Sequence, residues 1–236
     1  MTSSTMGRRL KAVPASTMHL WLMLVLTFTT GINDAIGYLG LDKVFTGNMT
    51  GNVVILGMAL AGADGLPILG PALALAGFMA GAAIGGRTLK YAGRAWTAGT
   101  TVLFGVTAAL MLVLSVVLFV AGDEPARWLM VTVTTLAAAA MGVQAAAARH
   151  VAVKDVTTVV VTSTITGLAA DSLLGSGKRN GSGRRFAAVA LILLGAAVGA
   201  LLLKAHLGYG LLLAGVLIAA ATALGGWHAR VTAEGA

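Results

Sequence analysis

The segment "VFTGNMTGNVV", residues 44–54, places polar and flexible residues in the middle of a strongly apolar chain. Two threonines, two asparagines and two glycines fall between Thr46 and Asn52. Polar groups of this density are unfavourable in a continuous helix that faces lipid, because every unpaired N–H or C=O group there lacks water as a partner. The segment therefore predicts a break in regular structure, and the fold depends on how its surroundings accommodate that break.

The surrounding composition is that of a membrane protein. The chain has 236 residues, of which 58% are hydrophobic and 10% are charged, whereas about 25% of the residues in soluble domains are charged. Uncharged runs such as 12–33, 65–86 and 95–122 reach the ~20 residues that cross a bilayer as a helix. These features predict an all-α, polytopic helical membrane protein whose first partner is the lipid bilayer.

The basic residues point to lipid and not to nucleic acid. The net charge is +8, but the Lys and Arg side chains lie in short connections between the apolar runs, where cytoplasmic loops face anionic lipid. We therefore expect no nucleic-acid partner. The chain has no cysteine, which excludes disulfides, thiolate metal sites and thiol catalysis.

Lys and Arg also indicate which apolar segments cross the membrane. The eight segments are 18–41, 44–63, 66–86, 97–121, 126–148, 157–175, 186–204 and 208–227. If all eight cross, nine basic residues share the side of the N-terminus and seven lie opposite. If the polar segments 44–63 and 157–175 enter and leave on one side, thirteen of the sixteen share the side of the N-terminus. Short cytoplasmic loops are rich in Lys and Arg, so the second arrangement is favoured.

We therefore expect six spans plus two re-entrant or broken polar helices in the cytoplasmic membrane, with both termini in the cytoplasm. Lys43, Arg127 and Lys204 are then the basic residues outside. The first apolar run is too long for a cleaved signal peptide. The predicted organisation is a basic tail at 1–17, one membrane domain at 18–227 and a short tail at 228–236.

Three pairs of short patterns indicate an internal repeat, with halves at about 18–121 and 126–227. Thr46 to Gly51 aligns with Thr162 to Gly167 at an offset of 116. Upstream, Gly31-Ile32-Asn33 resembles Gly142-Val143-Gln144, and downstream Gly77-x-x-x-Gly81 matches Gly195-x-x-x-Gly199 at an offset of 118. Three spans in each half make the second half inverted relative to the first, so a 3+3 inverted repeat is predicted.

The stretch GINDAIGYLGLDKVFTGNMTGNVV, residues 31–54, resembles the YoaK-like family of bacterial integral membrane proteins, whose function is unknown. The similarity covers most of the chain, and Asn48 to Asn52 match the family's asparagine-methionine-threonine-glycine-asparagine core in full. Relatives tend to have threonine-glycine-threonine where this chain has Thr162-Ser163-Thr164, and often an amide where it has Ala145. The resemblance implies a membrane location and does not imply a reaction.

Asp34 is the most pronounced single candidate, because it lies inside the first span. A carboxylate there is costly unless it is paired or hydrated, so it is a candidate for binding a proton or Na⁺. The structural alternative pairs Asp34 with Lys43, or with the side-chain amides of Asn48 and Asn52. Asp171, late in the second polar segment, is expected to be a pairing or water-facing residue.

The other candidates carry amide, hydroxyl or flexible backbone groups in the polar motifs and the spans before them. They are Asn33, Thr46, Asn48, Thr50, Gly51, Asn52, Gln144, Thr162, Thr164 and Thr166. A break between Gly47 and Gly51 starts a half-helix near Thr50, whose first N–H groups point into the protein. Alternatively, the same residue types only bond neighbouring helices together.

These features predict a transporter or channel for a small solute or ion, with a midplane site built from the two inverted polar motifs. The alternative is a non-transporting membrane scaffold or assembly protein whose polar motifs only hold helices together. The sequence has no nucleophile motif, phosphate-binding loop or metal-ligand spacing of histidines, so no catalytic residue, cofactor or metal is expected. Its G-x-x-x-G patterns are compatible with a homodimer, and they are equally compatible with packing inside one chain.

Overall fold

The computed structural model describes most of the chain outside the extreme termini. The described residues are 13–93, 95–122, 124–153, 158, 161–172, 175–177 and 181–233. Several basic residues used in the topology prediction therefore lie outside them, namely Arg8, Arg9, Lys11, Arg94, Lys154, Lys178 and Arg179.

Six helices within the described ranges are long and apolar enough to cross a membrane. They are Ala15–Gly40, which comprises α2 (Ala15–Ala35) and the π-helical turn η1 (Ile36–Gly40), α4 (Leu69–Thr88), α5 (Ala98–Ala121), α6 (Arg127–Val151), α8 (Ser182–Leu203) and α9 (Leu207–Ala233). They coincide with the six spans expected from charge, and the described residues contain no strand. The prediction of an all-α polytopic membrane protein is confirmed.

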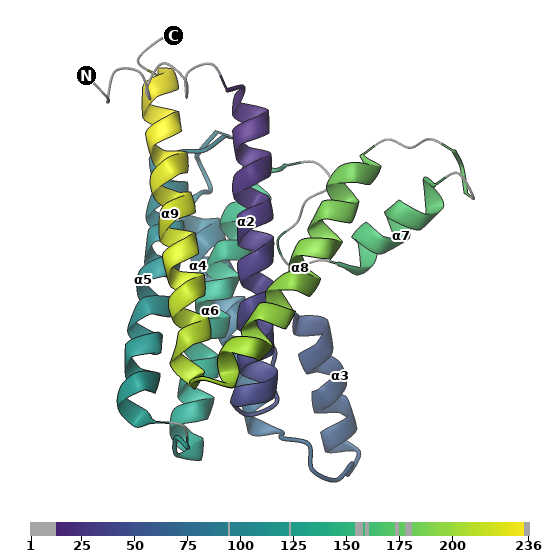
Figure 1. Ribbon diagram of the computed structural model, residues 1–236, viewed down its shortest axis with the longest axis vertical. Coiled ribbons are helices and arrows are strands. Elements are labelled where there is room, and N and C mark those ends of the chain that lie inside the picture. Colours follow the sequence, from purple (N-terminus) through teal and green to yellow (C-terminus); the bar gives the residue numbers. More distant parts are fainter. Residues whose placement is uncertain are drawn as a thin grey trace.

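The helices form a bundle from which one arm diverges (Figure 1). α5, α9, α2, α4 and α6 run roughly parallel to the long axis, and α8 leans away from it. The core lies where α2, α5, α6 and α9 meet, around Met23, Phe104, Met111, Met141 and Leu211. The outward faces of α4 and α8 are rich in exposed apolar side chains, as lipid-facing helices are.

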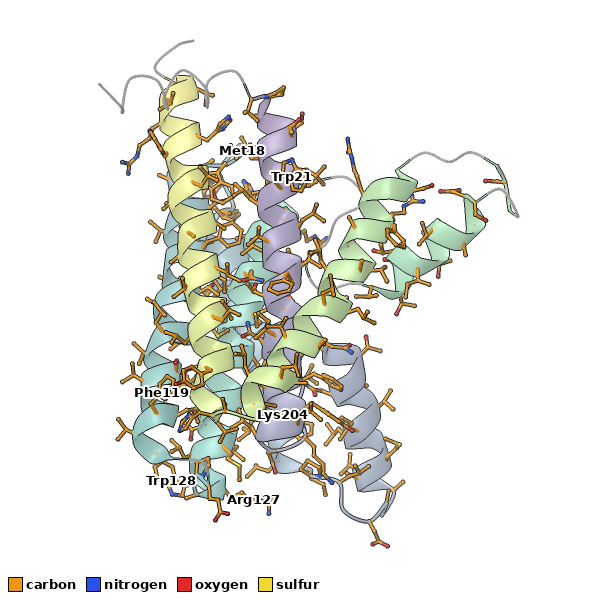
Figure 2. All side chains as sticks on the ribbon, in the orientation of Figure 1. Met18, Trp21, Phe119, Arg127, Trp128 and Lys204 are labelled. Carbon is orange, nitrogen blue, oxygen red and sulfur yellow. The ribbon has the colours of Figure 1, made fainter. Side chains whose placement is uncertain are left out.

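The two ends of the bundle carry different loops. α2 begins and α9 ends at the same end of the bundle (Figure 1). Met18 and Trp21 mark that end in Figure 2, whereas Arg127, Trp128 and Lys204 mark the opposite end. At the opposite end Asp42 forms an ion pair with Arg127, with 3.8 Å between Oδ1 and Nε. Arg127 and Lys204 thus lie at the end opposite the start of α2, as the expected topology requires.

Two shorter helices, α3 (Met49–Leu60) and α7 (Thr162–Ala170), correspond to the two polar segments. α3 has 12 residues, about 18 Å of helix, and α7 has 9, so neither can cross a hydrocarbon core of about 30 Å. The segment that contains α3 begins and ends at the same end of the bundle, because the Lys43 Nζ atom donates to the Gly65 carbonyl oxygen at 3.0 Å.

Glycines allow two equivalent close helix pairs, α2 with α8 and α4 with α6. A Cβ atom added to Gly31 of α2 would collide with the Ile192 carbonyl oxygen of α8. Likewise, a Cβ atom added to Gly142 of α6 would collide with the Phe78 carbonyl oxygen of α4. Gly31 matches Gly142 at an offset of 111, as expected from the sequence, so the two halves of the chain repeat the same contact.

The predicted match of Gly77 with Gly195, at an offset of 118, is wrong. The contacts of Gly81 with Ala139 and of Gly195 with Phe28 are the equivalent ones, which makes the offset 114. Gly85 and Gly199 confirm this register, since their added Cβ atoms would lie against Ala146 and Ala35. The error arises because α4 carries glycines at 77, 81 and 85, so the spacing alone fits two registers.

The same packing has a consequence for the homodimer left open by the glycine patterns. The glycine faces of α4 and α8 are used within the chain, against α6 and α2. They therefore provide no support for association between two copies.

This packing predicts that Gly81→Ala and Gly195→Ala each lower the free energy of unfolding by about 2 kcal/mol or more, because the added Cβ atom meets backbone that cannot give way. Gly105→Ala in α5 is the control, since nothing lies within 4 Å of its added Cβ atom. That change should be neutral or raise stability by up to about 1 kcal/mol. Thermal unfolding in detergent measures both, and equal midpoints for Gly81→Ala and Gly105→Ala would contradict the close approach.

Candidate functional site

The carboxylate of Asp34 is the acceptor around which the loop before α3 is folded. Its Oδ1 atom accepts the backbone N–H groups of Thr46 at 2.9 Å, Gly47 at 2.7 Å and Asn48 at 3.4 Å. The Thr46 hydroxyl lies at 3.4 Å from the same oxygen. Asp34 is buried, and it is thus held by a loop whose N–H groups would otherwise lack partners.

Neither structural alternative considered for Asp34 is found. Lys43 bonds to Gly65, and among the described residues no Asn48 or Asn52 side chain bonds to the carboxylate. No described lysine, arginine or histidine forms an ion pair with it. Among the described residues, the carboxylate is held by three N–H groups and one hydroxyl group and by no cation, which is an arrangement in which it keeps capacity for a further cation or donor.

Asn52 braces the same loop from α3. Its Nδ2 atom donates to the Phe45 carbonyl oxygen at 2.6 Å, and its Oδ1 atom accepts the Phe45 N–H at 2.8 Å. One buried side chain thereby satisfies both backbone groups of a residue that belongs to no helix. Gly51 lies against the Phe45 ring, where an added Cβ atom would be 2.6 Å from Cδ2, so this position has no room for a side chain.

Asn48 caps α3. Its Oδ1 atom accepts the Gly51 N–H at 3.3 Å, and the helix begins at the next residue, Met49. A half-helix beginning near Thr50 was expected from the sequence, and the observed start is within one residue of it. Gly47 brings the loop close to α2, since an added Cβ atom would lie 2.9 Å from the Thr30 Cγ2 atom.

The second polar motif forms α7, which is anchored at its C-terminal end. The Arg185 guanidinium on α8 donates to the Gly167 carbonyl oxygen at 2.9 Å and pairs with Asp171. Asp171 is therefore a pairing residue, as expected. Within α7 the Thr166 hydroxyl donates to the Thr162 carbonyl oxygen at 2.9 Å, and Thr164 is buried. Most of the chain from 154 to 160 lies outside the described residues.

The N-terminal ends of α3 and α7 meet at a cavity of about 270 Å³. It is lined by Asp34, Gly47, Asn48, Met49, Thr50, Phe78, Val161, Thr162 and Ile192. The structure thus brings together Asp34, Asn48, Thr50 and Thr162 among the residues expected from the sequence. A carboxylate, an amide and two hydroxyl groups can hold a small polar or cationic ligand by hydrogen bonds and charge.

Other expected site residues lie outside the cavity lining. Thr46, Gly51 and Asn52 shape the loop, and Thr164 and Thr166 lie further along α7. Sequence reasoning missed Phe78 and Ile192, which form the apolar part of the lining. The sequence contains a signal for them, because they are 114 residues apart and thus equivalent in the repeat. Recognising this equivalence requires the correct register of α4 and α8.

Asn33 and Gln144 lie between α2 and α6, each with no exposed surface. The Asn33 Nδ2 atom contacts the Met141 sulfur at 3.3 Å, and the Gln144 Nε2 atom contacts the Thr30 hydroxyl oxygen at 3.5 Å. The amide oxygens of both residues are buried without a hydrogen-bond partner among the described residues. Each such acceptor costs about 1–3 kcal/mol, so two of them in one place require an explanation.

Comparisons with known proteins agree with this architecture. A family model described as "Protein of unknown function (DUF1275)" matches residues 22–224. The chain is also 32% identical over 151 residues to the UPF0700 transmembrane protein YoaK of Bacillus subtilis (strain 168). That similarity covers 64% of this chain and 65% of the relative, so slightly less than two thirds of the relative's length is spanned. No solved structure matches.

The brace made by Asn52 generates a stability prediction. Asn52→Leu should lower the free energy of unfolding by about 2–4 kcal/mol, because two backbone groups of the half-buried Phe45 lose their partners. Asn48→Ser is the matched control and should stay within about 0.5 kcal/mol of the parent, since serine also caps helices. Thermal unfolding in detergent measures the difference, and similar midpoints for the two variants would refute the brace.

Proposed function

The chain belongs to the DUF1275 family of proteins of unknown function, and from the cavity beside Asp34 we propose that it moves a small solute or ion across the membrane. One observation carries the proposal. In a multi-pass membrane protein, two short helices that cannot cross the bilayer direct their N-terminal ends at one polar cavity that contains a carboxylate. Discontinuous helices that meet at a polar site are the layout of secondary transporters and of some channels.

In this proposal α3 and α7 are re-entrant. The residues before α3 adopt no regular helix, and such backbone is tolerated at membrane depth only where protein or a watery cavity surrounds it. Asp34 and Asn52 satisfy the N–H and C=O groups of this loop at the cavity wall, which supports its position within the bilayer. The first N–H groups of α3 then lie at the depth at which a transported solute would be held.

The repeated contacts of α2 with α8 and of α4 with α6 support a mechanism of alternating access. Because the two halves are related by an inverted repeat, exchanging their conformations would open the cavity first to one side of the membrane and then to the other. Both halves of the chain line the cavity. The first half contributes Phe78 and Thr50, and the second contributes Ile192 and Thr162. Movement of either half would therefore change access to the site.

We place both termini in the cytoplasm of a bacterial cell and the chain in the cytoplasmic membrane. Lys90 follows α4, and Arg87 and Arg149 lie in the last turns of α4 and α6, at the end of the bundle where α2 begins. Lys43, Arg127 and Lys204 belong to the other end. Lys178 and Arg179, which precede α8 in the sequence, add to the first set. This distribution follows the enrichment of positive charge in cytoplasmic loops.

This orientation predicts the labelling of single cysteines introduced into a chain that has none. In intact cells an impermeant thiol reagent should label Asp64→Cys, in the exposed connection between α3 and α4, and should not label Lys90→Cys. Both should react after the membrane is opened, which controls for accessibility. If eight segments crossed instead, Lys90→Cys would react from outside and Asp64→Cys would not.

The alternative function is a membrane scaffold whose polar motifs only hold helices together. One observation favours it, because Asp34, Thr46 and Asn52 all have hydrogen bonds that fold the loop itself. Thr50 and Thr162 separate the two functions, since no hydrogen bond joins either side chain to another described residue, yet both line the cavity. Their hydroxyl groups have a use in translocation and none in holding the loop.

We therefore predict that Thr50→Val and Thr162→Val lower solute flux by about three- to tenfold while thermal stability is kept, because each removes one hydrogen bond to the ligand. Asp34→Asn should lower flux at least about tenfold, since it removes the charge. Flux of Na⁺, K⁺, chloride, formate, urea and glycerol is measured in proteoliposomes. Thr132→Val is the control, with an exposed hydroxyl that bonds only to its own helix. Flux of no tested solute, or equal flux in all four variants, would favour the scaffold.

A further inference from the structure

Beyond a translocation cavity, we infer that the crossing of α2 and α6 holds a monovalent metal cation. Its ligands are the amide oxygens of Asn33 and Gln144, and the carboxylate of Asp34 balances its charge. The inference deepens the proposed function and rests on it for the use of the cation, which would accompany the solute or be the solute itself. The binding site is assigned independently, from contacts at the centre of the repeat.

The two amide residues occupy equivalent places in the repeat. Asn33 and Gln144 are 111 residues apart, as are Thr30 and Met141, which is the offset between α2 and α6 found at their glycines. The contact of Gln144 with Thr30 therefore corresponds to the contact of Asn33 with Met141. The two pairs run in opposite order along the two helices, so the amides lie close to the pseudo-twofold axis, where a site shared by both halves is expected.

Neighbouring groups determine which atom of each amide is left without a partner. The Thr30 hydroxyl donates its hydrogen to the Leu26 carbonyl oxygen at 2.9 Å, so towards Gln144 it can only accept, and Nε2 must face it. The sulfur of Met141 is likewise only an acceptor, so the Nδ2 atom of Asn33 faces it. Both amide oxygens are therefore directed away from these partners and are buried without any donor among the described residues.

The charge next to these oxygens is negative. Gly47 lies against both the partners of the amides and the carboxylate. A Cβ atom added to it would lie 2.9 Å from Thr30, 3.4 Å from the methyl carbon of Met141 and 3.5 Å from the Asp34 Oδ1 atom. Every hydrogen bond of the Asp34 carboxylate within the described part of the chain ends on Oδ1, which leaves Oδ2 free. Asp34 also lines the cavity and directly follows Asn33 in α2, so the carboxylate lies between the cavity lining and one of the two amides in the sequence of the helix.

Two carbonyl-type oxygens beside one carboxylate favour a small, hard, singly charged cation. Amide and carboxylate oxygens are the ligands that such cations prefer, and soft metals prefer sulfur or imidazole. Divalent cations usually recruit more carboxylates, and among the described residues no three His, Cys, Asp or Glu side chains gather anywhere. A neutral solute would leave the Asp34 charge without a counter-ion in a site of low dielectric constant.

The test measures equilibrium binding in the full-length protein in detergent. Thermal unfolding is followed by tryptophan fluorescence in chloride salts of Li⁺, Na⁺, K⁺ and Rb⁺, against N-methyl-D-glucamine chloride at equal ionic strength. At least one of the metal ions should raise the unfolding midpoint by about 3 °C, with saturation at millimolar concentration, because a ligand of the native state stabilises it. Identical midpoints in all five salts overturn the inference.

Variants separate a cation site from a purely structural role. Gln144→Met and Asn33→Leu should abolish the ion-specific shift, yet leave unchanged or raise the midpoint in N-methyl-D-glucamine, because an unpartnered amide has been replaced by an apolar group. Ser115→Ala is the control, since it removes a buried hydrogen bond to Gly208 elsewhere in the bundle and should lower the midpoint in every salt while the shift persists. A full ion-specific shift in Gln144→Met would refute the assignment.

Gln144→Glu is a second variant, for the case in which the apolar ones do not fold. Its added carboxylate should lower the cation concentration for half-maximal stabilisation by about tenfold, the change that about 1.4 kcal/mol of extra binding produces. An unchanged or raised half-maximal concentration contradicts the site. The test also stands apart from translocation. If the unfolding midpoint does not depend on the ion but Thr50→Val still lowers solute flux, only the cation site is rejected. If the midpoint shifts with a specific ion but no solute flux is detected, only translocation is rejected.

Discussion

The structure around the cavity depends on a requirement of the backbone, namely that the loop before α3 has N–H groups and no helix to accept them. Asp34 provides one oxygen for three of these groups, and Asn52 satisfies both backbone groups of Phe45. The loop can therefore turn back inside the protein, and α3 can begin at Met49 with its first turn facing the cavity. The same contacts explain how a carboxylate persists within an apolar span, because N–H dipoles replace the water that it has lost.

The second constraint is the separation of the helix axes, which glycine sets. Gly31 and Gly195 bring α2 and α8 into backbone contact, and Gly81 and Gly142 do the same for α4 and α6. Without a hydrophobic driving force between helices in lipid, contact of this kind is the main source of helix association. It also determines the cavity, because Phe78 and Ile192 belong to these close pairs and form its apolar wall. Packing and site are thus consequences of the same few residues.

Much of this fold is predictable from the sequence, and what is not has definite causes. Charge counting predicted the six long helices, since lysine and arginine placement is a property of the chain and not of its packing. The cap at Asn48 was close to predictable, because asparagine followed by a helix-forming run is a local signal. The alignment of α4 with α8 in the repeat was not predictable, since three evenly spaced glycines fit two alignments. The hydrogen bonds of Asn52 with the backbone of Phe45 were not predictable either, because they depend on where Phe45 lies in space.

The two halves match in their packing but not in their charge. Asp34 has Ala145 as its equivalent at the offset of 111, so the second half cannot hold its polar motif with a carboxylate from the same place. It is tied instead at the far end of α7, where Arg185 contacts Gly167 and Asp171. One short helix is therefore held near its start and the other near its end. Because the cavity lies at the start of both helices, Asp34 holds the first loop at the cavity itself, whereas Arg185 contacts α7 at the end away from the cavity. The cavity is therefore asymmetric, because the first half contributes the Asp34 carboxylate to its lining and the second half contributes Thr162 and Ile192.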